Sequence, residues 1–173
     1  QNARFPGIKL AWFSYALMLV GAMIAETITF MGKADVMFTA YVPLKAHPAF
    51  YFGIILFAVG ALITCIHFLV AIYITRKEGY HQGSLPLFTF GLVCAAVIAI
   101  FTLLCGSITF VPTLLLSLDL IPSVDPAFYR IAFWGFGHSA QQINLCAHVS
   151  IWYLLGALTV GAKPVNQKLS RVA

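Results

Sequence analysis

The 173 residues of this chain are 61% hydrophobic and only 9% charged, and the formal net charge is +5. Soluble domains carry about 25% charged residues and roughly 45–50% apolar ones, so the composition excludes a soluble globular domain and predicts a membrane protein. The basic residues lie at the ends of apolar runs and in the segments between them. Because they do not gather in one patch, nucleic acid is not expected as a partner.

Four apolar runs are each long enough to cross the hydrocarbon core of a bilayer, which needs about 18 or more residues. We expect helices over about residues 8–30, 49–74, 87–110 and 126–162. The predicted fold class is therefore all-α, a polytopic membrane protein with four transmembrane helices. Residues 1–173 are expected to form a single membrane section.

The first half of the chain contains few polar side chains within its apolar runs. Glu26 lies near the far end of the first expected helix, where it is either an interfacial acid or a carboxylate that conducts protons. Pro43 and Pro48 exclude a regular helix through the next loop, and His47 is expected to have a capping or interfacial role before the helix that follows, in preference to a metal-ligand role. His67 is the strongest polar group of that second helix, and a hydrogen bond to a neighbouring helix is its expected role.

The second half begins with a helix suited to close packing. Gly91 and Gly106 would let a neighbouring helix approach it closely. Pro112 is expected to lie in the loop beyond its end. Asp125 and Pro126 then form a helix start, an N-cap carboxylate followed by proline at the first helical position.

The basic residues predict the orientation of the chain in the membrane. Seven of them fall on one expected side and three on the other; the seven are Arg4, Lys9, Arg76, Lys77, Lys163, Lys168 and Arg171, and the three are Lys33, Lys45 and Arg130. Cytoplasmic segments carry the excess of Lys and Arg, so both termini of this segment are predicted to be cytoplasmic.

The last expected helix has an unusual density of polar residues: His138, Gln141, Gln142, Asn144, Cys146 and His148. Polar groups are costly in hydrocarbon, so this cluster is a functional-site hypothesis. At about 100° per residue, His138, Gln142 and Cys146 share one helix face, which Tyr153 extends toward the cytoplasm. A metal site, a polar helix–helix interface and a transport path are all compatible with this pattern.

The FWGFGH run at residues 133–138 resembles the start of the sixth helix of subunit I in heme-copper oxidases, especially the B-type branch. There, such a run carries a histidine ligand of the active-site copper. Three more segments match in order: FTAYVPLKAHPAFY at residues 38–51, the basic loop after the second expected helix, and VDPAFYR at residues 124–130. The resemblance implies that the four helices are the family's third to sixth, part of a larger heme-copper oxidase helix bundle. It assigns the metal-ligand role to His138.

One departure from the family bears on the substrate. The family's oxidases have a tyrosine four residues after this histidine, which can supply an electron and a proton when the O–O bond breaks. Here that residue is Gln142, which can supply neither but can hydrogen-bond a bound ligand. Nitric oxide reductases of the superfamily lack the tyrosine, and one group has glutamine, so Gln142 favours reduction of NO to N2O. Ser139 also replaces the proline that usually follows the histidine.

The resemblance further implies heme and copper, or non-heme iron, bound mostly by parts outside this chain. None of the four spans contains the adjacent His-His pair that the family uses for copper. The chain is then a section of a catalytic subunit, split or processed, and incomplete alone. The implied partners are the remaining part of subunit I, a cytochrome c or copper-type subunit II, and the plasma membrane of a bacterium or archaeon.

The family's proton path includes tyrosines on the sixth helix, and Tyr153 matches one of them. Cys146 and Glu26 are further candidates for proton transfer, although Val149 stands where another tyrosine is expected. Two alternative functions stay open. One is a B-type cytochrome c oxidase that reduces O2 to water and pumps protons, and the other is a non-catalytic membrane subunit or assembly protein.

Overall fold

The computed structural model describes residues 6–36, 39–79 and 82–172. Arg4 and Phe38 lie outside the described residues. Helices are the only regular secondary structure in the described part of the chain, in the order α1 (Ile8–Phe30), α2 (Pro48–Lys77), α3 (Leu87–Ser117), α4 (Pro126–Val160) and α5 (Gln167–Val172). The first four are long and apolar enough to cross a membrane. The all-α, four-span prediction is therefore confirmed.

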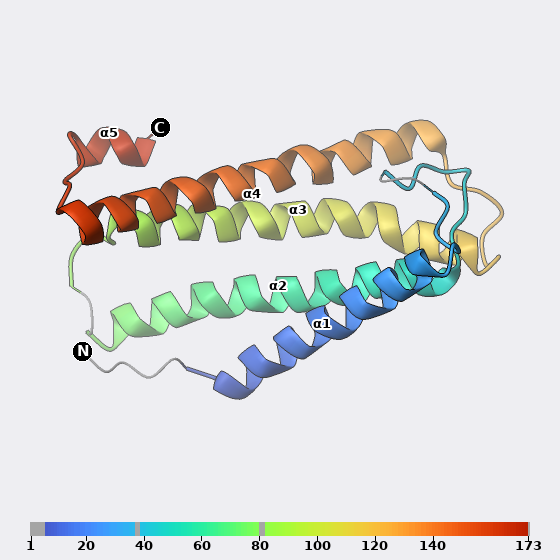
Figure 1. Ribbon diagram of the computed structural model, residues 1–173, viewed down its shortest axis with the longest axis horizontal. Helices are drawn as coiled ribbons and strands as arrows, with labels where there is room; N and C mark the ends of the chain where they lie inside the picture. Colours follow the sequence, from blue (N-terminus) through green and yellow to red (C-terminus); the bar gives the residue numbers. More distant parts are fainter. Residues whose placement is uncertain (1–5, 37–38, 80–81, 173) are drawn as a thin grey trace.

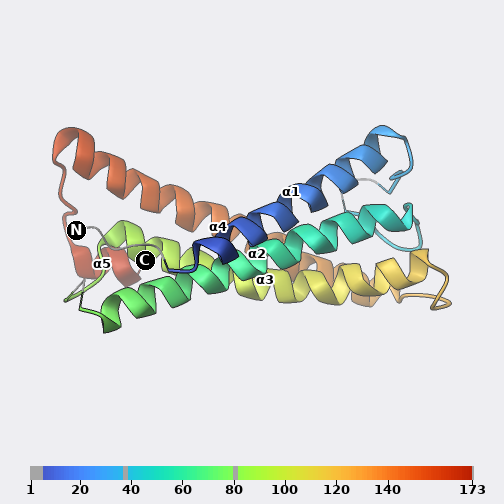
Figure 2. The same cartoon turned by 90° about the horizontal axis from the view of Figure 1, so that it is seen from below.

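The helices stand side by side in an open row, in the order α1, α2, α3, α4 (Figures 1 and 2). Contacts join α1 to α2, α2 to α3, and α3 to α4, and α5 folds back against α3. Within the described residues, α1 and α4 do not contact each other and form the two edges of the row. Large apolar side chains remain exposed along all four spans, as in a section of a wider helix bundle.

Pro112 lies inside α3, which continues to Ser117, so the prediction that this proline belongs to a loop was wrong. Proline lacks a backbone N–H, and in membrane helices nearby Ser and Thr side chains help to satisfy the backbone groups that it frees. Thr109 and Thr113 flank it, but neither hydroxyl bonds to the carbonyl of Ile108, which Pro112 leaves without its usual N–H partner; both bond to other carbonyls of the same helix. Thr109 donates to the carbonyl of Gly106 at 2.8 Å, and Thr113 donates to the carbonyl of Thr109 at 2.5 Å.

Side-chain caps define the starts of α2 and α4. Nδ1 of His47 accepts a hydrogen bond from the N–H of Ala49 at 3.2 Å, which confirms its predicted capping role. Oδ1 of Asp125 accepts from the first two free N–H groups of α4, at 2.7 and 3.1 Å. At the other end of α4, Gly161 has a φ of 64°, the left-handed conformation that favours glycine at a helix C-terminus.

Close packing of α1 on α2 depends on glycine. A Cβ atom added to Gly21 would lie 2.5 Å from the backbone nitrogen of Phe57, and one added to Gly60 would lie 2.6 Å from the carbonyl oxygen of Ser14. Both distances are far below a normal van der Waals contact. The two backbones touch because these residues have no side chain.

The packing of α3 on α4 confirms the predicted role of two glycines. A Cβ on Gly91 would lie 2.1 Å from Oγ of Ser150, and one on Gly106 would lie 3.1 Å from the ring of Phe136. Both glycines therefore make room for side chains of α4.

The main buried cluster of the chain lies at the end of the row where α1 leads into α2 and α3 leads into α4 (Figure 1). It combines the 33–47 loop with the adjoining helix ends, and its members are Val36, Ala40, Val42, Ala46, Tyr51, Phe110, Leu116, Tyr129 and Phe133. The hydroxyl of Tyr129 donates to the carbonyl of Thr39 at 3.2 Å. The loop thus joins the α1–α2 hairpin to α4.

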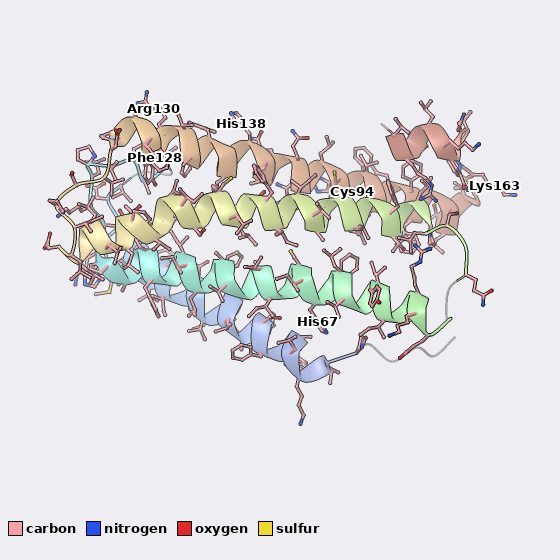
Figure 3. The ribbon with its side chains drawn as sticks, turned by 180° about the vertical axis from the view of Figure 1, so that it is seen from behind. His67, Cys94, Phe128, Arg130, His138 and Lys163 are labelled. Atoms are coloured by element: carbon pink, nitrogen blue, oxygen red, sulfur yellow. The ribbon has the colours of Figure 1, made fainter. Side chains whose placement is uncertain are left out.

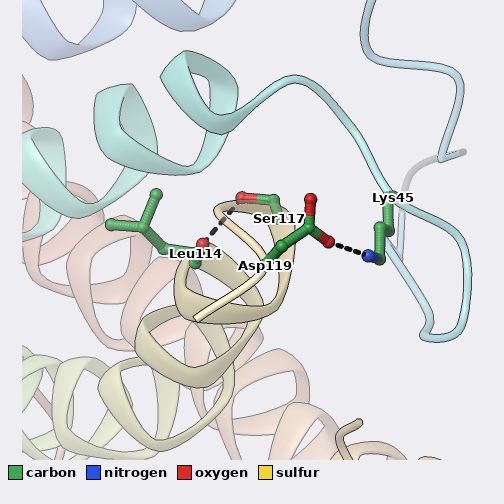
Figure 4. A network of polar contacts seen from close by, with 4 residues as sticks. All are labelled: Lys45, Leu114, Ser117 and Asp119. Atoms are coloured by element: carbon green, nitrogen blue, oxygen red, sulfur yellow. Dashed lines mark hydrogen bonds and ion pairs between the residues drawn. The ribbon is translucent and has the colours of Figure 1, made fainter. Parts of the chain in front are cut away.

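An exposed ion pair joins the two loops at this end (Figure 4). Nζ of Lys45 lies 2.7 Å from Oδ1 of Asp119, with side-chain exposures of 45% and 83%. In the same turn, the hydroxyl of Ser117 donates to the carbonyl of Leu114 at 2.8 Å. An ion pair this exposed contributes only about 0–1 kcal/mol, so the buried cluster dominates the stability of this end.

Candidate functional site on α4

His138 and Gln142 lie one turn apart on α4, and both side chains are exposed. Figure 3 shows His138 pointing away from α3, toward the outside of the row. Because α4 is an edge helix, no other described span covers this face. Residues four apart on a helix are separated by about 6 Å along the axis and about 40° around it. The two side chains can therefore reach one shared ligand.

Trp134, one turn before the histidine, packs against the imidazole. The two ring centroids are 4.9 Å apart and the ring planes are tilted by 33°. A contact of this kind covers part of a ring face, whereas the two ligating nitrogens lie on the ring edge. Within the described residues no hydrogen bond engages either nitrogen of His138. The imidazole is thus held in place with a lone pair available to a metal ion.

A metal site needs several donor side chains close together. Among the described residues, no three His, Cys, Asp or Glu side chains are close enough to hold a metal ion. His138 offers one nitrogen on an uncovered face, which suits copper or iron provided that the other ligands come from outside this chain. The residues present therefore fit a shared metal centre and not a self-contained one.

The other polar residues of α4 divide between two sides. Gln141, Asn144 and His148 are exposed, as are His138 and Gln142. Cys146 is half-buried, and its carbonyl lies 3.5 Å from a Cβ added to Gly91 of α3. Cys146 therefore lies on the side of α4 that faces α3.

The two remaining candidates for proton transfer lie far from the histidine. Tyr153 is half-buried near the end of α4, and its hydroxyl donates to Oγ of Ser170 in α5 at 2.9 Å. Glu26 is exposed on α1, at the opposite edge of the row. The structure does not bring Glu26 together with Cys146 or Tyr153.

His67 is buried between α1 and α2. Its Nε2 lies 2.6 Å from the carbonyl oxygen of Pro6, and the ring packs on Gly7. His67 therefore has a structural role, as expected, but its partner is the segment that precedes α1 and not a neighbouring helix.

Two aromatic residues near the site received no role from the sequence. The indole N–H of Trp134 donates to the hydroxyl of Tyr41, in the 33–47 loop, at 2.6 Å. Both residues belong to the segments that carry the family resemblance. Their contact spans 93 positions of the sequence, however, and no local pattern signals it.

The fold is that of a multi-pass helical membrane protein with an exposed polar face on one edge helix. The chain matches the family profile described as Cytochrome C and Quinol oxidase polypeptide I over residues 2–173. It therefore belongs to that family, the subunit I family of heme-copper oxidases, whose members are oxidoreductases that hold heme and copper in the full subunit.

A curated relative and a solved structure agree with this assignment. The chain is 28% identical over 171 residues to cytochrome c oxidase subunit 1 of Thermus thermophilus, covering 97% of this chain and 30% of that protein. It also superposes with a TM-score of 0.84 and 28% identity on a chain from the cryo-EM structure of a heme-copper terminal oxidase dimer, covering 95% of this chain and 29% of the other. The chain thus spans about a third of the length of these relatives.

Proposed function

We propose that this chain is a section of the catalytic subunit of a respiratory heme-copper oxidoreductase and that it supplies the metal ligand His138. The observation that carries the proposal is that His138 and Gln142 are both exposed and lie one turn apart on an edge helix. A histidine directed at lipid would be costly and without purpose, so this face requires a partner. The partner proposed is the remaining part of subunit I, which would also bind the heme groups.

Copper or non-heme iron together with a high-spin heme, if bound at such a site, would supply electrons to a diatomic gas. The residues of this chain have simpler tasks. His138 holds one coordination position through a ring nitrogen, and Trp134 fixes the plane of its ring. The apolar side chains around them exclude water from the site once the partner helices are in place.

Gln142 leads us to propose NO as the substrate. Reduction of two NO molecules to N2O and water takes two electrons and two protons and breaks no O–O bond. An amide can donate a hydrogen bond to a developing negative charge on the bound gas, but it cannot supply an electron. Gln142 is therefore adequate for NO reduction, and its position one turn from His138 supports a role beside the bound gas.

Reduction of O2 to water with proton pumping is the second candidate. The similarity to cytochrome c oxidase subunit 1 of Thermus thermophilus favours it. In this case the electron and proton that tyrosine supplies in related oxidases would have to come from another residue of the complete subunit. A non-catalytic membrane subunit is the remaining alternative, and it predicts a complex without a CO-sensitive high-spin heme.

Proton supply and orientation complete the proposal. Tyr153 and Cys146 would carry protons from the cytoplasmic side, with both termini of the segment in the cytoplasm of a bacterium or archaeon. Glu26 would serve only if another part of the complex connects α1 to the site. A cytochrome c or copper-type subunit II would donate electrons.

The first experiment tests the ligand. His138→Ala in the purified complete complex should abolish turnover and lower the copper or non-heme iron content by one equivalent. His148→Ala is the matched control, an exposed histidine on another side of the same helix, and should leave both values unchanged. Wild-type metal content and turnover in the His138→Ala complex would refute the proposed ligand.

The second experiment identifies the gas. The purified complex is supplied with electrons, and anaerobic formation of N2O from NO is compared with consumption of O2. Gln142→Ala should lower NO turnover by about 10²-fold, the usual effect of removing one hydrogen-bond donor to developing charge, and should retain the metal. Gln141→Ala, turned by about 100° on the helix, should have no effect. Rapid O2 consumption without N2O formation would overturn the NO assignment and select the second candidate.

A further inference from the structure

The outer loop and α4 are joined by one hydrogen bond that leads directly to the candidate ligand. The hydroxyl of Tyr41 accepts the indole N–H of Trp134 at 2.6 Å. The same indole ring lies 4.9 Å from the imidazole of His138, centroid to centroid. Three side chains, one from the loop and two from α4, therefore form a continuous line of contacts.

We propose that Tyr41 and Trp134 are positioning residues that hold the His138 ring in its ligating orientation. The inference rests on the proposed function, because it concerns the geometry of that ligand. An isolated histidine on an exposed helix face has several rotamers and a freely turning ring. The indole restricts it on one side, and the hydrogen bond to Tyr41 fixes the indole.

Tyr41 is itself held from several directions. Its ring packs edge-on against Tyr129 and Phe133, with centroid distances of 6.0 and 5.7 Å. The guanidinium of Arg130 lies 5.4 Å from the centre of the Tyr41 ring, a cation–π contact. The hydroxyl of Tyr41 is thus presented to Trp134 by three residues of α4.

The backbone around Tyr41 is also held, by the burial of its neighbours and by a hydrogen bond from α4. Its neighbours Ala40 and Val42 are only 3% and 5% exposed, and Tyr129 donates to the carbonyl of Thr39 at 3.2 Å. The loop therefore cannot move away from α4 without breaking buried contacts. A loop that is held by buried contacts in this way can support a metal ligand, whereas a loop held only at the surface could not.

Gly137 gives the indole its room. A Cβ atom at this position would lie 3.0 Å from Cε3 of Trp134, tighter than ordinary contacts allow. Alanine at residue 137 would push the ring from its place beside His138. The sequence thus provides the ring, its hydrogen-bond acceptor and the space that it occupies.

The test uses the complete complex with Tyr41→Phe, Trp134→Phe and the double variant. Tyr41→Phe removes only the accepting oxygen and keeps the aromatic packing. The matched controls are Tyr73→Phe and Trp152→Phe, whose side chains are 65% and 66% exposed. The readouts are metal content, turnover, and the infrared C–O stretching band of carbon monoxide moved by light from the heme to the neighbouring metal at low temperature.

We expect the Tyr41 and Trp134 variants to keep the metal, to broaden or shift the C–O band, and to lose about 10- to 100-fold in turnover, the usual cost of losing an outer support of a metal ligand. The double variant should be no worse than the more severe single one, because both changes break the same bond. An unchanged band and normal turnover in both single variants, or strictly additive losses, would overturn the proposal. If Tyr41→Phe lowers the yield of complex, Trp134→Phe decides the question with the same readouts.

The His138→Ala complex separates this inference from the proposed function. If that complex loses the metal-bound C–O band while Tyr41→Phe and Trp134→Phe keep it unchanged, His138 is the ligand and the positioning role fails alone. If the His138→Ala complex keeps the band, the proposed function fails first and the positioning role fails with it.

Discussion

Substitution of Gly21 by alanine should destabilise the α1–α2 pair measurably. The added Cβ would lie 2.5 Å from the backbone nitrogen of Phe57 and 2.6 Å from the carbonyl oxygen of Gly53. Normal contacts begin near 3.5 Å, so the helices must separate locally by about 1 Å. Backbone atoms cannot turn aside as a side chain can. Overpacking of this kind costs about 1–3 kcal/mol.

A second glycine isolates this cost from helix propensity. Gly156→Ala, in α4, places a Cβ 3.7 Å from Ala162, an ordinary contact, and gains the same propensity of about 1 kcal/mol. The difference between the two variants therefore measures the clash alone, about 1–3 kcal/mol. The assay is the temperature at which half of the purified complex precipitates in detergent, with about 2–4 °C expected per kcal/mol. Equal midpoints for Gly21→Ala and Gly156→Ala would refute the packing argument.

Three further changes test other contacts of the chain. Lys45→Ala should lower the stability that is read from this midpoint by no more than about 1 kcal/mol, because its bridge to Asp119 is exposed, and a larger loss would mean that the bridge is buried in the complex. Asp125→Ala removes the N-cap of α4 and should lower the stability that is read from this midpoint by about 0.5–2 kcal/mol, whereas Asp125→Asn, which keeps an accepting oxygen, should lower it less. Arg171→Ala should release α5, since the guanidinium donates to the carbonyl of Leu85, and limited proteolysis should then remove the tail faster without changing turnover. Cleavage of the tail at the wild-type rate would contradict this last contact.

The number and type of the spans could be predicted because length and hydropathy alone decide them. The ends of the helices were harder to predict from the sequence, and Pro112 shows why. In water, a missing N–H and a steric clash usually end a helix. In α3 the surroundings are apolar, and the hydroxyls of Thr109 and Thr113 bond within the helix. The helix continues for five residues past the proline, to Ser117.

The residues of the candidate site could be predicted from the sequence, but their arrangement in space could not. A helical wheel placed Cys146 beside Gln142, yet the packing of α3 leaves Gln142 exposed and covers part of Cys146. Which face of α4 is covered depends on which helix packs against it. That packing depends in turn on glycines and aromatic residues that are distant in the sequence. For the same reason the bond between Tyr41 and Trp134 has no local signal.

Because of the buried cluster at the loop end of the row, the two ends of the molecule differ in how much aromatic surface they bury. Its large aromatic side chains lock the loop and three helices together, whereas the opposite end has mostly alanine and hydroxyl side chains among its buried residues. His138 follows Phe133, a member of the cluster, by little more than one turn. Tyr153 lies about 30 Å farther along α4 than Phe133. The densest aromatic packing therefore lies beside the residue for which a metal bond would demand the most accurate position, and far from Tyr153, where a proton relay would need only transient contacts.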